Sequence, residues 1–201
     1  MKKFVLFFFA LGLTAMFFMQ NVQAQVTTNG GSGLDLSYPS LASAITALNA
    51  ATINGAVLIT VDVNETAPAG GYTITQLGGT AAFPIVIDGN GKAVTAYSPQ
   101  TAGGRLDAII KIVGGDYITI QNFILKENTG NTATTLASNP MTEFAVALFY
   151  NSVTNGAQNI TIQNNTITLA NNYQNAIGVY SSTQHSSSVY NTAAPATATS
   201  G

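Results

Sequence analysis

The residues able to do chemistry are few and spread along the chain. Eight acidic residues, six basic residues and one histidine occur among 201 positions, and cysteine is absent. Elimination at a uronate sugar needs acids clustered around calcium and a nearby base. The acids here form no Asp-x-Asp pair and show no calcium-like spacing. They are Asp35, Asp62, Glu65, Asp88, Asp107, Asp116, Glu127 and Glu143.

Three weak catalytic candidates emerge from this set. Lys111, on a strand with Asp107 nearby, is the best proton acceptor, although a lone outward lysine usually only aids solubility. Glu127 and Glu143 could meet across adjacent loops, and glycoside hydrolysis needs two carboxyls about 5–9.5 Å apart. His185 lies in a polar run without a second histidine. We therefore assign no catalytic, cofactor-binding or metal-binding residue and expect no cofactor; whether the chain is an enzyme stays open, with a non-enzyme favoured.

An aromatic strip is the one candidate binding surface. Aligning similar strands pairs Val113, Phe149 and Tyr180, each out of phase with its inward neighbours. Phe149 and Tyr180 would then form an outward strip able to bind sugar rings. The alternative is that a loop, Asn128 to Met141, folds over it.

Composition excludes several classes of protein. Charged residues make up 7% of the chain, against about 25% in typical domains, and the net charge is −2 with no basic patch, so no nucleic-acid partner is expected. The missing cysteine excludes disulfides, thiolate zinc sites and a lipid-modified N-terminal cysteine. A hydrophobic content of 46% is enough to bury a core.

The first 24 residues predict a secretory signal peptide. Lys2 and Lys3 precede an apolar run from Phe4 to Met19, and Val22-Gln23-Ala24 resembles a cleavage site. A membrane anchor is the alternative, but a span needs about 20 apolar residues. We expect a mature chain starting near Gln25, without a transmembrane span, exported to the medium or the outer cell surface.

One helix and many short strands are predicted in the mature chain. Residues 25–37 are Gly- and Ser-rich and suggest a flexible leader. Residues 38–56 contain a helical pattern, with Ser40 as N-cap and apolar residues on one face. From 57 to 182, short β-branched runs bounded by Gly, Asn, Asp or Pro predict an all-β fold. The apolar helix residues are Leu41, Ala44, Ile45 and Leu48.

An internal repeat favours a solenoid over a sandwich or a barrel. Ile118-Thr-Ile-Gln-Asn122 recurs as Ile160-Thr-Ile-Gln-Asn164, 42 residues later, and related strands precede and follow each copy. We expect Ile118 to lie over Ile160 and Ile120 over Ile162, in parallel strands. Asn122 and Asn164 should occupy turns, because asparagine tolerates left-handed backbone geometry. The register after each asparagine is left open.

These segments resemble the pectin-lyase-like superfamily of right-handed parallel β-helices. Tyr38 to Asn54 resembles its N-terminal capping helix, and Gly115 to Phe123 and Asn159 to Leu169 look like its repeats. They are most similar to large secreted or surface β-helix proteins of Gram-negative bacteria. The resemblance implies the fold and says little of function, since the superfamily includes lyases, hydrolases and adhesins.

The last segment, 183–201, loses the strand pattern and is expected to be a low-complexity loop of a longer protein, truncated at its C-terminus. Together these features predict a secreted or cell-surface scaffold, adhesin-like, that presents loops to polysaccharide or cell-surface ligands. The alternative is the N-terminal part of a polysaccharide lyase or glycoside hydrolase whose active site lies on missing coils.

Overall fold

The computed structural model describes residues 24–104, 106–135, 139–173 and 175–186. The predicted signal peptide therefore lies outside the described residues except for Ala24, as does the predicted loop from residue 187 onward. Strands dominate, joined by one α-helix, α2 (Leu41–Ala50), and a short 3-10 helix, η1 (Gly31–Gly33). The chain is all-β in class, as predicted, and most of its strands pair in parallel.

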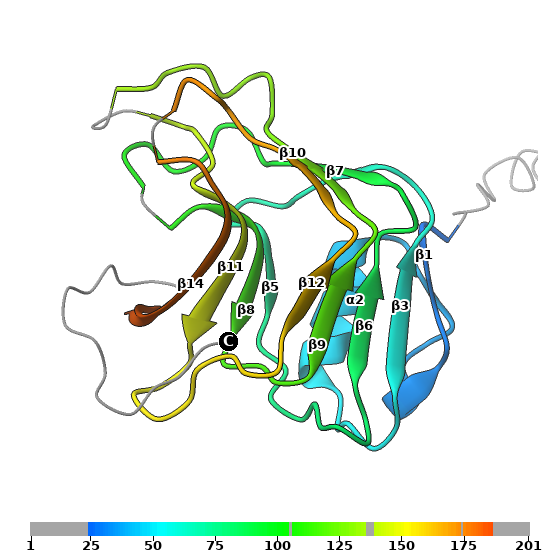
Figure 1. The fold of residues 1–201 in the computed structure, drawn as a ribbon. Coiled ribbons are helices and arrows are strands. Elements are labelled where there is room, and N and C mark those ends of the chain that lie inside the picture. The colour runs from blue at the N-terminus through cyan, green and yellow to red at the C-terminus, as the bar shows by residue number, and fades with distance from the viewer. Residues whose placement is uncertain (1–23, 105, 136–138, 174, 187–201) are drawn as a thin grey trace, which may run out of the picture.

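The strands form three sheets (Figure 1). Sheet A contains, in order, β12 (Thr161–Gln163), β9 (Ile118–Gln121), β6 (Ile85–Asp88), β3 (Val57–Val61), β1 (Val26–Thr28) and β2 (Ser37–Tyr38). Sheet B contains β13 (Thr166–Thr168), β10 (Ile124–Lys126), β7 (Ala93–Thr95) and β4 (Glu65–Thr66). Sheet C contains β14 (Ile177–Ser186), β11 (Phe144–Tyr150), β8 (Ala108–Val113) and β5 (Tyr72–Ile74).

From β3 onward the chain visits the sheets in strict rotation. It passes from sheet A to sheet B to sheet C and then returns to sheet A, so that each strand lies beside the strand one round earlier. The turns from sheet A to sheet B are the tightest, and from the second round onward the connections from sheet B to sheet C are the longest. Apolar side chains from all three sheets and from α2 fill one core.

The predicted stacking of the repeats is confirmed. Strands β9 and β12 pair in parallel with Ile120 opposite Ile162, and β6 adds Ile87 opposite Ile120 on the other side. Ile118 and Ile120 are fully buried, so they point into the core. Asn122 and Asn164 have φ values of 59° and 54°, which confirms their place at left-handed turns. Asn90 follows β6 in the same way, with φ of 49°.

The segment 25–37 differs from the flexible leader that was predicted. Its strand β1 pairs antiparallel with β3, with Val26 opposite Val61, and β2 pairs with β1 in turn. Val26 is buried in the core. The physical reason is that the edge of β3 would otherwise expose unpaired backbone groups, and a short Val-Thr-Thr strand can pair with them.

Helix α2 occupies the predicted residues and is held at its first turn. Ser40 forms a capping box with Ser43, and the Leu41 amide donates to Oε1 of Glu65 at 2.8 Å. The other Glu65 oxygen accepts from the Tyr72 hydroxyl at 2.7 Å. The apolar face is buried in the core that also contains Val57 and Ile59: Leu41, Ala44, Ile45 and Leu48.

Replacing Glu65 with alanine is expected to lower the free energy of unfolding by about 1–2 kcal/mol, because the change removes a carboxylate bonded to a helix N-terminus and a tyrosine partner. Urea unfolding would measure the loss. Asp62→Ala is the matched control, because the Asp62 carboxylate accepts only a solvent-exposed hydrogen bond from the Thr27 hydroxyl. We expect its free energy of unfolding to stay within about 0.5 kcal/mol of the wild-type value. Equal losses in both variants would contradict the anchoring role.

The last strand is longer than the sequence indicated. Strand β14 runs to Ser186, whereas the sequence predicted a loop from residue 183. Pairing with β11 extends it, since Tyr150 lies opposite Ser186 after a register shift. Within the part of the chain that the structure describes, no helix has the length and apolar character needed to cross a membrane.

Candidate functional site

The predicted aromatic strip lies on sheet C and is packed into a cluster. Phe149 is 0% exposed and belongs to a small core with Val113 and Phe144, against which Tyr180 packs partly buried. The rings of Phe144 and Tyr180 stack at 4.5 Å, and the Phe149 ring lies 6.2 Å from that of Tyr180. Phe149 is therefore not available to a ligand in this arrangement, and the aromatic side chains contribute to packing.

The predicted register of this strip is half right. Phe149 pairs with Val113 as expected, but Tyr180 pairs with Ala147 and not with Phe149. In the observed register Val146 lies between Ile110 and Val179. The predicted and observed pairings of Tyr180 differ by two residues, so both leave the same side chains on the inner face, and alternation along the strand does not choose between them.

Charged residues on the same sheet form a buried cluster. Lys111 is 8% exposed and Glu143 is 2% exposed, while Asp107 is also buried. The backbone amide of Asp107 donates to Oε2 of Glu143 at 3.0 Å, and the Tyr173 hydroxyl donates to Oε1 at 2.7 Å. The structure thus brings Lys111 and Asp107 together with Glu143, but it buries all three away from any polymer in solution.

Burial shifts the pKa of each member of this cluster. It raises the pKa of Glu143 to about 7, against the opposing effect of the hydrogen bond from Tyr173. It also raises the pKa of Asp107, which Lys111 partly offsets, and lowers the pKa of Lys111, which both carboxyls oppose. These are the directions expected when charged forms lose hydration.

Glu127 serves a different purpose from the one predicted for it. Its Oε2 accepts from the Thr142 amide at 2.9 Å, and its Oε1 accepts from the Thr142 hydroxyl at 2.9 Å and from Asn131 at 2.8 Å. Glu127 is therefore bonded to Thr142, the residue before Glu143, but the carboxylates of Glu127 and Glu143 have different hydrogen-bond partners. Glu127 fixes the path of the loop between β10 and β11.

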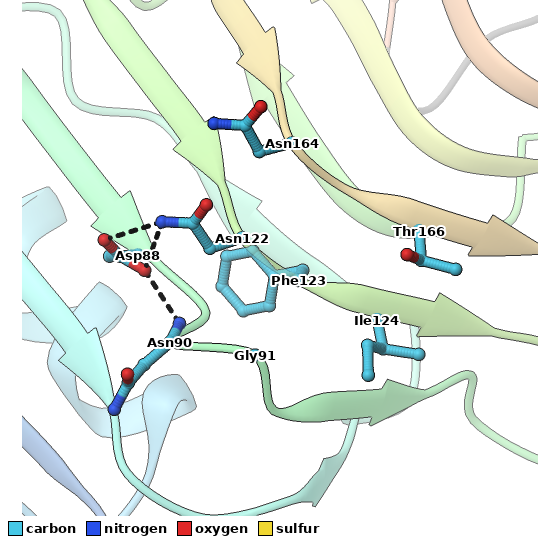
Figure 2. A pocket seen from close by; sticks show the side chains of 8 residues that line it. All are labelled: Asp88, Asn90, Gly91, Asn122, Phe123, Ile124, Asn164 and Thr166. Atoms are coloured by element: carbon cyan, nitrogen blue, oxygen red, sulfur yellow. Dashed lines mark hydrogen bonds between the residues drawn. The ribbon is translucent and has the colours of Figure 1, made fainter.

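A groove of about 470 Å³ opens where sheet A turns into sheet B (Figure 2). Residues from three successive rounds of the chain line it: Asp88, Asn90, Gly91, Asn122, Phe123, Ile124, Asn164 and Thr166. Polar side chains from several rounds of the chain converge in this groove, and we take it as the candidate site.

Asp88 organises the floor of the groove. Its Oδ1 accepts from the Asn90 amide at 2.7 Å, its Oδ2 accepts from Gln121 at 2.8 Å, and the Asn122 side chain donates to both oxygens at 3.0 Å. Partial burial acts to raise the pKa of Asp88, but these hydrogen bonds outweigh it and hold the pKa below its ordinary value. Asp88 is a carboxylate at neutral pH.

A ladder of side-chain amides continues beside the groove. Gln163 donates to Gln121 at 2.8 Å, and Gln121 donates to Asp88, so one residue from each round is joined in a chain. Sequence reasoning assigned Asn122 and Asn164 to turns and missed their convergence with Asp88. A signal for this convergence is present in the sequence. Asp88, Gln121 and Gln163 occupy the same position of successive rounds, and each is followed by Asn or by Gly-Asn.

Among the residues that the structure describes, no group of three or more His, Asp or Glu side chains is arranged to hold a metal ion. His185 lies in β14, and its side chain is not among those described. Tyr173, which sequence analysis did not single out, joins the buried cluster from an Asn-rich loop whose composition gave no sign of it.

Comparison with known proteins adds no relative: no model of a protein family matches the chain, and neither does any curated protein or solved structure.

Proposed function

We propose that this chain is a right-handed parallel β-helix, exported through its first 24 residues, that serves as a carbohydrate-binding scaffold outside the cell or on its outer surface. The observation that carries the proposal is the rotation of the chain through three parallel sheets with like residues in register. Such a stack is a rigid frame on which loops can vary without disturbing the core.

Two features support a frame that presents loops. First, the connections between sheets B and C, at 96–107, 127–143 and 169–176, are long and emerge on one side (Figure 1). Second, two of them are bonded to each other: Asn128 and Asn131 donate to the carbonyls of Ala96 and Tyr97 in the preceding loop. In this proposal α2 covers the first round, as a solenoid end requires.

A polysaccharide lyase or glycoside hydrolase is the second candidate function. The observation in its favour is the meeting of Lys111 with Asp107 and Glu143, where burial lowers the pKa of the lysine, the direction that favours a proton acceptor. Their burial weighs against it, because a proton acceptor must reach the sugar. We therefore rank binding above cleavage.

Incubation with a panel of insoluble polysaccharides and with polygalacturonate would separate the two functions. We expect the purified chain to be retained on at least one polysaccharide, to release no soluble sugar and to produce no rise in unsaturated-uronate absorbance. Calcium should not bind tightly in calorimetry. Glu127→Ala, which frees the loop between β10 and β11, should weaken retention several-fold while the far-ultraviolet spectrum is kept. Product formation that stops on adding a chelator would overturn the proposal.

A further inference from the structure

We propose that the groove at the turn from sheet A to sheet B binds a short, neutral oligosaccharide, as a site separate from the loops between sheets B and C. The inference rests on the proposed carbohydrate-binding role and names one place where it is carried out.

The carboxylate of Asp88 is engaged. Four hydrogen bonds reach its two oxygens, from the Asn90 amide, Gln121 and Asn122. A carboxylate so occupied has little capacity left for a ligand, since it offers about four lone-pair sites in total. Its effect is to orient Asn122: the nitrogen of that amide is tied to Asp88, so the oxygen is directed away from it (Figure 2).

The free hydrogen-bonding groups lie above this floor. Three groups that line the groove form no side-chain hydrogen bond with any residue that the structure describes. They are the Oδ1 atom of Asn122, the side-chain amide of Asn164 and the hydroxyl of Thr166. Asn164 and Thr166 are exposed, and Ile124, which is 39% exposed, adds an apolar patch between them and Gly91. Asn122 and Asn164 follow paired residues of adjacent strands, and adjacent strands lie about 4.8 Å apart.

This set of groups suits a neutral sugar. It offers amide and hydroxyl groups, which can both donate and accept, beside an apolar patch that can contact the C–H face of a ring. A cation is disfavoured because the one carboxylate is saturated by donors. A uronate is disfavoured because the groove contains no lysine or arginine, and the fixed negative charge of Asp88 repels it.

The test is titration of the purified chain with maltohexaose, cellohexaose and mannohexaose, with hexagalacturonate as the acidic comparison, followed by isothermal calorimetry. We expect saturable binding of at least one neutral hexaose and at least tenfold weaker binding of the uronate. Asn164→Gly should lower the affinity for the neutral sugar at least fivefold. Glycine is chosen because it adopts the positive φ of this turn without strain.

Asn159→Gly is the matched control. Asn159 is also exposed and left-handed, with φ of 55°, but it lies outside the groove. It should bind the sugar as the wild type does, and so should Glu127→Ala. If Asn164→Gly binds the sugar as tightly as the wild type does, the proposal that the groove binds it is contradicted, while the scaffold proposal is unaffected. If the wild type binds a hexaose but is not retained on any polysaccharide, the scaffold proposal is contradicted and the groove proposal stands. If the wild type binds no neutral hexaose, the groove proposal is contradicted.

Discussion

Replacing Ile120 with alanine should lower the free energy of unfolding by about 3 kcal/mol. Ile120 is fully buried and lies between Ile87 and Ile162 in three consecutive strands of sheet A. Truncation leaves a cavity that the neighbouring rounds cannot close, because each is fixed by its own ladder of backbone hydrogen bonds.

Ile162→Ala is the control for this experiment, since it is the same substitution at the equivalent position of the next round. Ile162 is only partly buried, because no described strand packs over the free edge of β12. We expect a loss of about 1–2 kcal/mol. Urea unfolding of both variants, followed by circular dichroism, measures the difference. A loss for Ile162→Ala as large as that for Ile120→Ala would contradict the stacked arrangement.

Stability should fall by about 2–3 kcal/mol as the pH rises from 5 to 8, chiefly because of Glu143. Burial raises the pKa of this carboxyl from 4.5 to about 7, so the folded chain holds the proton more tightly than the unfolded chain does. The stabilisation is complete below pH 4.5 and is lost as the pH passes through about 7. Asp107, whose pKa is also raised by burial, contributes with the same sign.

Glu143→Gln should remove most of this pH dependence. Glutamine resembles the protonated acid: its oxygen can accept from the Asp107 amide and its nitrogen can donate to the Tyr173 hydroxyl, so the two hydrogen bonds have replacements. The variant should be more stable than the wild type at pH 8 and about equally stable at pH 5. Lys111 also faces this cluster, but burial lowers the pKa of Lys111 from 10.5, so its contribution has the opposite sign.

Denaturant unfolding at several pH values, read as the midpoint and slope at each, tests this prediction. Asp35→Asn is the control, since it changes an exposed acid between β1 and β2 and leaves Glu143 and its partners in place. It should keep the wild-type profile. A wild-type stability that is flat or rises between pH 5 and 8 would show that Glu143 is ionised without cost in the folded chain.

Local patterns in the sequence were sufficient to predict the helix, the short strands and the stacking of the two Ile-Thr-Ile-Gln-Asn segments. Each of these depends on residues close together in the chain: a capping serine before a period of 3.6, alternation of apolar and polar residues, and asparagine at turns that need a left-handed backbone. An exact repeat also sets its own register, because a slip of one residue would turn Ile120 outward.

Only the tertiary structure decided what the chemical residues do. Phe149 looked like an outward binding residue because alternation places it on the outer face, but that face is itself covered in the folded chain, which alternation within one strand cannot show. Tyr180 pairs with Ala147, two residues away from the partner that alternation suggested, and a shift of two residues leaves the pattern of inner and outer side chains unchanged.

The same holds for the polar residues. Glu143 follows a loop whose path depends on bonds made by Glu127 and the neighbouring asparagines, and this loop brings it to Asp107 and Lys111, which lie close together in the chain. The groove at Asp88 exists because three turns, each unremarkable alone, are stacked by the sheets that precede them. Periodicity determines which face of a strand a residue occupies, whereas burial and convergence depend on which other segments lie against that face.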